Sequence, residues 1–200
     1  MFLYSWSGFV YSCITHMMFI NLLIFGAVQL QILQIKLRNV ANNTQPITPK
    51  ETTQLLKQLI VEHKNAINFI NTLNEKTKSI VLMEFIFSSM DVASVARSLT
   101  NGTINISSLG WMFLFFILLS LQIFAMAWNT NEIKIQSLAI SDAMFESSWY
   151  LMDKEGQQLT HIVMMRAQKP LAITIGPFGP MTTQSALLMF KAAYSYISIM

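Results

Sequence analysis

Two long uncharged stretches constrain this chain more than any other feature. No Asp, Glu, Lys or Arg occurs from residue 1 to 35 or from residue 98 to 131. A helix needs about 20 mainly apolar residues to cross the hydrocarbon core of a bilayer, and both stretches are longer. Over the whole chain 53% of residues are hydrophobic and 12% are charged, about half the charged share of soluble domains. The sequence therefore predicts an integral membrane protein.

Two weaker apolar segments extend this prediction to four spans. Residues 80–99 are largely apolar but contain Glu84, Asp91 and Arg97, and the short segment 182–200 contains Lys191. Together with the uncharged stretches, these segments predict an all-α integral membrane protein with long cytoplasmic helical extensions. The predicted spans are residues 1–35, 80–99, 109–131 and 182–200.

The distribution of basic residues predicts how the chain is oriented. Seven Lys and Arg lie within residues 36–79 and four within residues 132–170, whereas residues 100–108 contain none. By the positive-inside rule the two basic segments are cytoplasmic and the short loop is extracellular. Glycosylation sequons at Asn101 and Asn105 agree with an outside loop. The C-terminus should therefore lie outside.

A capping signal predicts where the first cytoplasmic arm begins. In "TPKE", Thr48 can cap a helix, Pro49 suits the first helical position, and Glu51 can close a capping box. A helix from residue 49 to 99 would be ~75 Å long, well beyond the ~30 Å hydrocarbon core, so it must project into the cytoplasm. Its apolar stripe comprises Leu56, Ile60, His63, Ile67, Ile70, Leu73 and Thr77.

The third span should continue in the same way past Asn131. Asp153 can then cap a further helix over residues 154–168. These cytoplasmic helices either bundle within the chain or meet those of neighbouring subunits, and periodicity supports both arrangements. The apolar side chains of the last helix are Leu159, Ile162, Val163 and Met165.

The last third of the chain carries an ordered series of motifs. "SSWY", "MMRAQKP", a Gly-Pro hinge and "LMFKAAYSY" follow one another between residues 138 and 198. In this order and spacing they resemble the C-terminal region of insect odorant receptors. The upstream part is similar to that family in layout only, through its long helices and its short outside loop.

The resemblance implies an odorant-binding subunit of a heteromeric ligand-gated cation channel. Its implied partners are an odorant co-receptor in a hetero-tetramer, a small volatile ligand and the lipid bilayer, and no cofactor is implied. Family members have seven spans and an inside N-terminus, so the four spans here correspond to the last four. We therefore expect an N-terminally incomplete receptor, in the plasma membrane of olfactory-neuron dendrites.

In this family the cytoplasmic helical ends form an anchor domain, which corresponds here to residues 132–170, and the last membrane helix lines a shared pore. Residues 171–181 would join the two. Pro170 cannot continue a helix, and Thr182 or Thr183 can cap the pore helix. The alternative is an ordinary loop between helices. The residues assigned to the hinge are Pro170, Gly176, Pro177, Gly179 and Pro180.

One stripe of the last helix is less apolar than the rest and is predicted to line the pore. Within it, Leu188 and Ile199 suit a hydrophobic constriction that closes by dewetting, and Ile199 is the expected gate. Alternatively the small residues allow close helix packing. Lys191 is expected outside the lumen, in a functional role or paired with an acidic residue of 80–99. The stripe comprises Gln184, Leu188, Ala192, Ser195 and Ile199.

Odorants are small and mostly uncharged, so their site should be an apolar pocket with few polar groups. The resemblance implies a site in the outer half of the membrane, to which the first and third spans contribute. Aromatic residues near a membrane surface are also common as interfacial anchors, so this alternative stays open. The candidate ligand contacts are Tyr4, Trp6, Phe9, Cys13, Trp111, Met112, Phe115 and Phe116.

Other classes of function have less support. The three histidines share no metal-ligand spacing, Cys13 is the sole cysteine, and no nucleophile–base motif or phosphate-binding loop occurs, so we predict no enzyme and no metal site. The net charge of +3 is too scattered to indicate nucleic acid. A G-protein-coupled receptor would place its C-terminus inside. A gustatory receptor-type channel subunit, a non-conducting truncated fragment and an unrelated membrane enzyme remain as alternatives.

Overall fold

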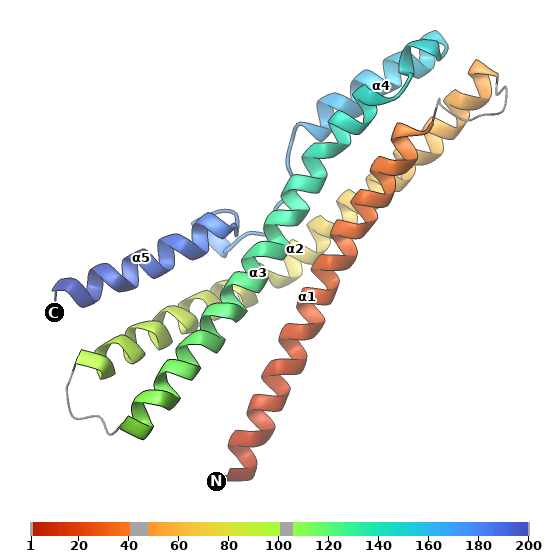
Figure 1. Ribbon diagram of the computed structural model, residues 1–200. Helices are drawn as coiled ribbons and strands as arrows, with labels where there is room; N and C mark the ends of the chain where they lie inside the picture. The colour runs from red at the N-terminus through yellow and green to blue at the C-terminus, as the bar shows by residue number, and fades with distance from the viewer. Residues whose placement is uncertain (1, 41–47, 101–105, 200) are drawn as a thin grey trace. The chain divides into compact units, whose positions relative to one another are not determined.

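The computed structural model describes residues 2–40, 48–100 and 106–199, apart from the side chains of residues 2–9, 12, 95–96, 98–100, 106–109, 192–194 and 196–199. The described chain is helical, and its one β-bridge is an isolated pair, Thr174 with Pro180. Figure 1 shows the order of the elements along the chain. They are α1 (Phe2–Arg38), α2 (Pro49–Thr100), α3 (Ile106–Glu146), η1 (Trp149–Leu151), α4 (Lys154–Ala167), η2 (Gly176–Phe178) and α5 (Thr183–Ile199).

The capping box at the start of α2 forms as the sequence predicts. The backbone N–H of Thr48 donates to Glu51 Oε2 at 2.9 Å, and the N–H of Glu51 donates to Thr48 Oγ1 at 3.4 Å. From Pro49 the helix continues without a break to Thr100, for 52 residues. Likewise α3 passes Asn131 and continues to Glu146. The long helical arms predicted from the sequence are therefore confirmed.

Two of the described helices are long and apolar enough to cross a membrane, judged by length and composition. These segments are Cys13–Arg38 within α1 and Gly110–Glu146 within α3. The other two predicted spans are weaker by the same measure: the end of α2 contains charged residues, and α5 has 17 residues. Their place in a membrane stays a prediction.

The chain divides into two compact units. The first unit contains Met1–Thr72 and Glu132–Leu171, so it holds α1, the beginning of α2, the end of α3, and α4. The second unit contains Leu73–Asn131 and Ala172–Met200, which include the end of α2, the beginning of α3, and α5. Both α2 and α3 pass from one unit into the other.

The core of the first unit is built mainly from leucine and isoleucine, as the apolar stripe of α2 predicts. Gln34 in α1 also reaches α3, where its Nε2 donates to the backbone oxygen of Gln136 at 2.9 Å and to Gln136 Oε1 at 2.7 Å. This bond joins two helices through a half-buried polar pair. Fully buried side chains include Leu23, Leu30, Leu37, Leu56, Ile70, Ile133 and Ile140.

Helix α4 packs through small residues. Asp153 caps it by accepting from the Gly156 N–H at 2.8 Å, as predicted, and it also accepts from Thr53 Oγ1 at 2.5 Å. The buried face is Gly156, Thr160, Val163 and Ala167, at steps of four, three and four residues. Two of the apolar residues singled out in the sequence lie on the other side, where Ile162 and Met165 are exposed. Small side chains allow α4 to approach its neighbours closely, so the bulkier residues face outward.

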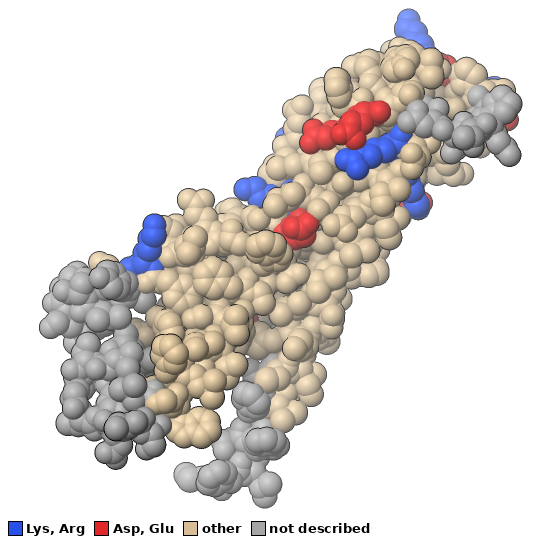
Figure 2. Space-filling model, in the orientation of Figure 1, with Lys and Arg blue, Asp and Glu red and all other residues tan. Residues whose placement is uncertain are grey.

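Charged side chains lie on the surface of the first unit. Lys36 pairs with Glu62, Arg38 with Glu146 and Lys57 with Glu155, each at 2.7 Å. Because these side chains remain about half exposed, each pair contributes at most ~1 kcal/mol. Figure 2 shows that most of the described surface on the visible face is uncharged.

Candidate functional site

The segment between α4 and α5 folds into a compact turn. The N–H of Met181 donates to the Ile173 carbonyl and the N–H of Ile175 to the Gly179 carbonyl, both at 2.8 Å. Gly176 and Gly179 have φ values of 49° and 97°, which residues other than glycine rarely adopt. Ile173, Ile175 and Met181 are buried under the turn. The predicted hinge, residues 171–181, is thus an ordered structure with its own hydrogen bonds.

This turn is attached to α2 at three successive points. Asn74 Oδ1 accepts hydrogen bonds from the Thr174 N–H at 2.8 Å and from Thr174 Oγ1 at 3.1 Å. Further along α2, Leu82 lies so close to Gly176 that a Cβ added there would meet its Cδ2 at 3.0 Å. At the third point the rings of Phe85 and Phe178 lie 6.5 Å apart. The turn therefore follows α2 closely.

The end of the turn is less constrained. At Gly179 an added Cβ would meet nothing within 4 Å, in contrast to Gly176. Thr182 then caps α5, because its Oγ1 accepts from the Ser185 N–H at 3.2 Å. Of the two predicted caps, Thr182 is the one observed. Pro170 and Pro177 are exposed, and Pro180 takes part in the β-bridge with Thr174.

Helix α5 has one buried face and one exposed face. Ala186 and Met189 are buried, while Gln184, Leu188 and Ser195 of the predicted pore stripe are exposed. The side chains of Ala192 and Ile199 lie outside the described residues. Lys191 is also exposed and, at 100° per residue, shares the helix face of Gln184, Leu188 and Ser195. That Lys191 lies outside the lumen stays a prediction.

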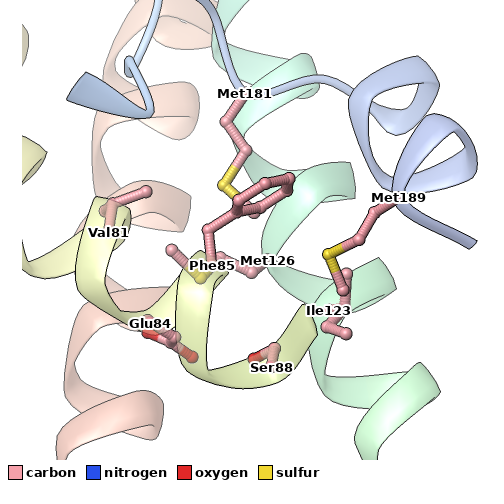
Figure 3. Close-up of a pocket in the computed structure, with 8 residues that line it drawn as sticks. All are labelled: Val81, Glu84, Phe85, Ser88, Ile123, Met126, Met181 and Met189. Atoms are coloured by element: carbon pink, nitrogen blue, oxygen red, sulfur yellow. The ribbon is translucent and has the colours of Figure 1, made fainter. Parts of the chain in front are cut away.

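Beside the turn, α2, α3 and the C-terminal segment enclose a small cavity of about 10 Å³, enough for at most one water molecule. In Figure 3, Phe85 extends from α2 toward Met181, and Met189 points toward Ile123 of α3. Glu84 and Ser88 form its polar side, and Glu84 accepts a hydrogen bond from Gln122 Nε2 at 3.1 Å. Methionine fills such irregular gaps well. The alternative ion pair between Lys191 and Glu84 or Asp91 stays a prediction.

The predicted odorant contacts fall into both units. Cys13 in α1 is exposed, whereas Trp111, Met112, Phe115 and Phe116 belong to the second unit. Phe116 packs edge-to-face on Phe190 of α5, with ring centroids 6.2 Å apart. Trp111 and Phe115 are exposed, and Met112 is half-buried. That these residues line one pocket stays a prediction.

Some predicted residues lie outside the described part of the chain. The sequon residues Asn101 and Asn105 belong to the segment that the structure leaves out, as do the side chains of Tyr4, Trp6 and Phe9.

Sequence reasoning missed the residues that fix the turn. Asn74 and Leu82 carry no motif, and their partners Thr174 and Gly176 lie far away in the sequence. The sequence gives one weak indication of the role of Asn74: it is a polar residue that directly follows Leu73 of the apolar stripe. Among the described residues no group of His, Cys, Asp and Glu could hold a metal ion.

Comparison with known proteins gives the family. Residues 1–194 match the family described as 7tm Odorant receptor. Odorant receptor 10 of Aedes albopictus is 27% identical over 91% of this chain and 48% of its own length. Odorant receptor Or2 of Anopheles gambiae is 29% identical over 72% of this chain and 38% of its own length. The chain therefore spans at most about half the length of these relatives.

A solved structure shares the fold. The insect olfactory receptor OR5 of Machilis hrabei, in complex with eugenol, superposes with a TM-score of 0.82 over 92% of this chain and 46% of its own length, at 19% identity. The same receptor in a second structure gives a TM-score of 0.80. Because its residues 1–194 match the family model, this chain belongs to the insect odorant receptor family.

Proposed function

We propose that this chain is an odorant-binding subunit of a heteromeric ligand-gated cation channel in the plasma membrane of olfactory neurons. The observation that carries the proposal is the family match over residues 1–194. The likeness in fold to an olfactory receptor solved with eugenol supports it, because eugenol is a small, mainly apolar molecule of the kind proposed here.

In this proposal the chain crosses the membrane four times. The spans are residues 1–35, 80–99, 109–131 and 182–200, and residues 36–79 and 132–170 lie in the cytoplasm. The basic residues and ion pairs of the first unit support this orientation, because charged side chains are stable in water and costly in hydrocarbon. The hydrophobic side chains exposed on α3, including Phe113, Leu118 and Leu121, suit contact with lipid.

The ligand binds among aromatic residues of α1 and α3. Cys13 and the exposed Trp111 and Phe115 provide apolar surface without charge, which suits an uncharged volatile molecule. Other parts of the receptor complete the pocket. The ligand acts by binding the open state more tightly than the closed state, because only a difference in affinity can shift that equilibrium.

The exposed face of α5 lines the pore, with Ile199 as the gate. Gln184 and Ser195 are polar groups on an otherwise apolar helix, and their exposure supports contact with water. Gly179, whose φ of 97° suits glycine and few other residues, is the point at which α5 pivots.

The chain assembles with an odorant co-receptor in a tetramer. The exposed apolar side chains Ile162 and Met165 of α4, with Tyr150 and Leu151 of η1, support a contact with another subunit in water. Such a patch is unfavourable on a lone cytoplasmic surface. The number of copies of each subunit is left to experiment.

The test is an odorant-evoked current. Two forms of the chain are each expressed with an odorant co-receptor: the unfused chain, and the chain fused after the N-terminal half of Odorant receptor 10 of Aedes albopictus. A panel of volatiles is then applied. We expect currents that the co-receptor alone does not give, in at least the fused form. Silence of both forms despite their presence at the cell surface would contradict the proposal. Currents carried by anions would contradict the cation selectivity.

A further inference from the structure

A second apolar hollow shares Phe85 and Met189 with the small cavity. It is a groove of about 360 Å³, formed by α2, the turn and α5 within the second unit. This volume is in the range of sites for small molecules, about 300–1,000 Å³. Its lining residues are Phe85, Ser89, Ala93, Ile175, Phe178, Ser185, Leu188 and Met189. None of these is among the predicted odorant contacts.

The groove has a buried floor and an aromatic wall. Ile175 and Met189 are 2% and 6% exposed, so a bound molecule would rest on a well-packed surface. Phe85 and Phe178 form one wall with their rings tilted by 34°. Phe178 and Leu188, at 71% and 57% exposed, form the rim that a ligand would cover. These contacts favour a compact apolar body, and an aromatic ring in particular.

The polar group that the groove would accept follows from its two serines. Ser89 Oγ donates its proton to the Ile86 carbonyl at 2.7 Å, and Ser185 Oγ donates to the Pro180 carbonyl at 3.0 Å. Each hydroxyl has a single proton, so toward a ligand both oxygens act as acceptors. Ser185 Oγ already accepts from the Thr182 N–H, which leaves Ser89 as the better acceptor. A complementary ligand therefore carries a hydrogen-bond donor, and an alcohol or phenol supplies one without charge.

We propose that this groove binds a small uncharged alcohol or phenol, at a site separate from the odorant pocket. The ligand's ring lies against Phe85 and Phe178, and its hydroxyl donates to Ser89. Because the walls come from α2, the turn and α5, the ligand joins the parts that must move when α5 pivots. This effect on gating rests on the proposed channel function, whereas the binding itself does not.

Photolabelling in membranes tests the binding directly. The probe is benzyl alcohol that carries a trifluoromethyl-diazirine at the para position, and labelled residues are mapped by mass spectrometry on the chain expressed with a co-receptor. We expect labels on residues 85–93 and 175–189. Excess benzyl alcohol should reduce them, and toluene, which has the ring but no hydroxyl, should compete about threefold to tenfold less well because it lacks one hydrogen bond.

Two pairs of substitutions localise the site. Ser89→Ala should weaken the competition by benzyl alcohol about threefold to tenfold and leave that by toluene unchanged. Its matched control is Ser94→Ala, since Ser94 Oγ makes the same kind of bond, to the Asp91 carbonyl at 2.9 Å, but does not line the groove. Ala93→Phe should fill the groove and remove the labels, and Met90→Phe, at an exposed position of α2 outside the groove, should keep them.

The outcomes separate the site from the proposed channel. Labels in the groove that benzyl alcohol displaces support the site, even if no current is measured. Odorant-evoked currents without labels in the groove overturn the site and leave the channel function standing. Labels that neither compound displaces, or that toluene displaces as well as benzyl alcohol, also overturn the proposal, because they indicate a groove filled by lipid chains or one that does not recognise a hydroxyl.

Discussion

The two units share α2 and α3, but different interactions hold the helices together within each unit. In the first unit ion pairs such as Lys57–Glu155 and polar contacts such as Thr53–Asp153 join the helices over a leucine-rich core. In the second unit several contacts are between aromatic rings, as where Phe190 stacks on Phe124 with centroids 5.5 Å apart, and polar links such as Asn74–Thr174 add to them. The interactions that pack α2 and α3 therefore change along the length of each helix.

This difference follows from the proposed topology, in which residues 36–72 and 132–170 of the first unit lie in water, whereas residues 1–35 of that unit and most of the second unit lie in hydrocarbon. Ion pairs at a water-exposed surface need no burial of charge, so they can link helices at little cost. In hydrocarbon the same charges would be costly, so close packing and aromatic contacts must do this instead. We therefore expect a response to pH mainly in the water-exposed part of the first unit, whereas in both units the effect of a substitution depends on how tightly the replaced residue is packed or hydrogen-bonded.

The largest effect expected in the first unit is a steric one at Gly156. A Cβ at this position would meet Thr53 Oγ1 at 2.6 Å and the Met152 Cβ at 2.9 Å, so Gly156→Val forces α4 away from α2. We expect a loss of about 3 kcal/mol in the stability of the first unit, measured by hydrogen exchange of peptides 50–70 and 154–167.

The matched control lies in the second unit. At Gly110 an added Cβ meets nothing within 4 Å, so Gly110→Val should change stability by no more than about 0.5 kcal/mol. Equal losses from the two substitutions would contradict the packing described for α4.

The next effect is the loss of the link between α2 and the turn. Asn74→Ala removes the acceptor of both Thr174 groups and leaves the Thr174 N–H without its partner, which should cost about 2 kcal/mol. Hydrogen exchange should rise in residues 173–181 of the second unit and stay unchanged in the first. Asn71→Ala, at an exposed position one turn earlier, is the control. If both substitutions loosen the turn equally, the Asn74 link is not what holds it.

What the sequence predicted, and what it missed, depends on how far apart the partners lie. The capping box of Thr48 and Glu51 and the cap of Asp153 on Gly156 each involve residues three apart, so local patterns were enough to find them. The long arms followed from an apolar stripe without Gly or Pro. The positive φ values of Gly176 and Gly179 agree with a Gly-Pro turn.

The contacts that position the turn and α4 were not predictable in this way. Asn74 and Thr174 are 100 residues apart, as are Thr53 and Asp153, and no local pattern marks either pair. The buried face of α4 was also missed, because hydrophobicity favoured Ile162 and Met165 whereas close packing required Gly156 and Thr160. The groove beside Phe178 depends on three separate segments and could come only from the structure.

The expected pH response of the first unit depends on His63. Burial lowers the pKa of this imidazole below its ordinary value of 6.5, and the nearby Arg166 lowers it further. The unfolded chain takes up a proton as the pH falls through about 6.5, but folded His63 resists it, so stability is lost on acidification and is constant at higher pH.

This response can be measured as hydrogen exchange of residues 56–70 between about pH 7.5 and 5.5, after correction for intrinsic exchange. His63→Leu should flatten the pH dependence, whereas His161→Leu should not, because His161 is exposed beside Trp149. A His63→Leu variant that keeps the full pH slope would assign the response to other groups. Peptides of α5 in the second unit should lack this dependence on His63.

The smallest effect distinguishes two buried threonines of the first unit. Thr160 is fully buried in α4 and its Oγ1 makes no hydrogen bond, whereas Thr53 Oγ1 donates to Asp153. Thr160→Val replaces a hydroxyl without a partner by a methyl group of similar size, so stability should be unchanged or rise by about 1 kcal/mol. Thr53→Val instead removes a hydrogen bond to a carboxylate and should cost about 1.5 kcal/mol or more. Changes in stability of opposite sign for the two variants, measured by thermal unfolding, would locate the polar link between α2 and α4 at Asp153. A loss from Thr160→Val as large as that from Thr53→Val would instead mean that the Thr160 hydroxyl has a hydrogen-bond partner.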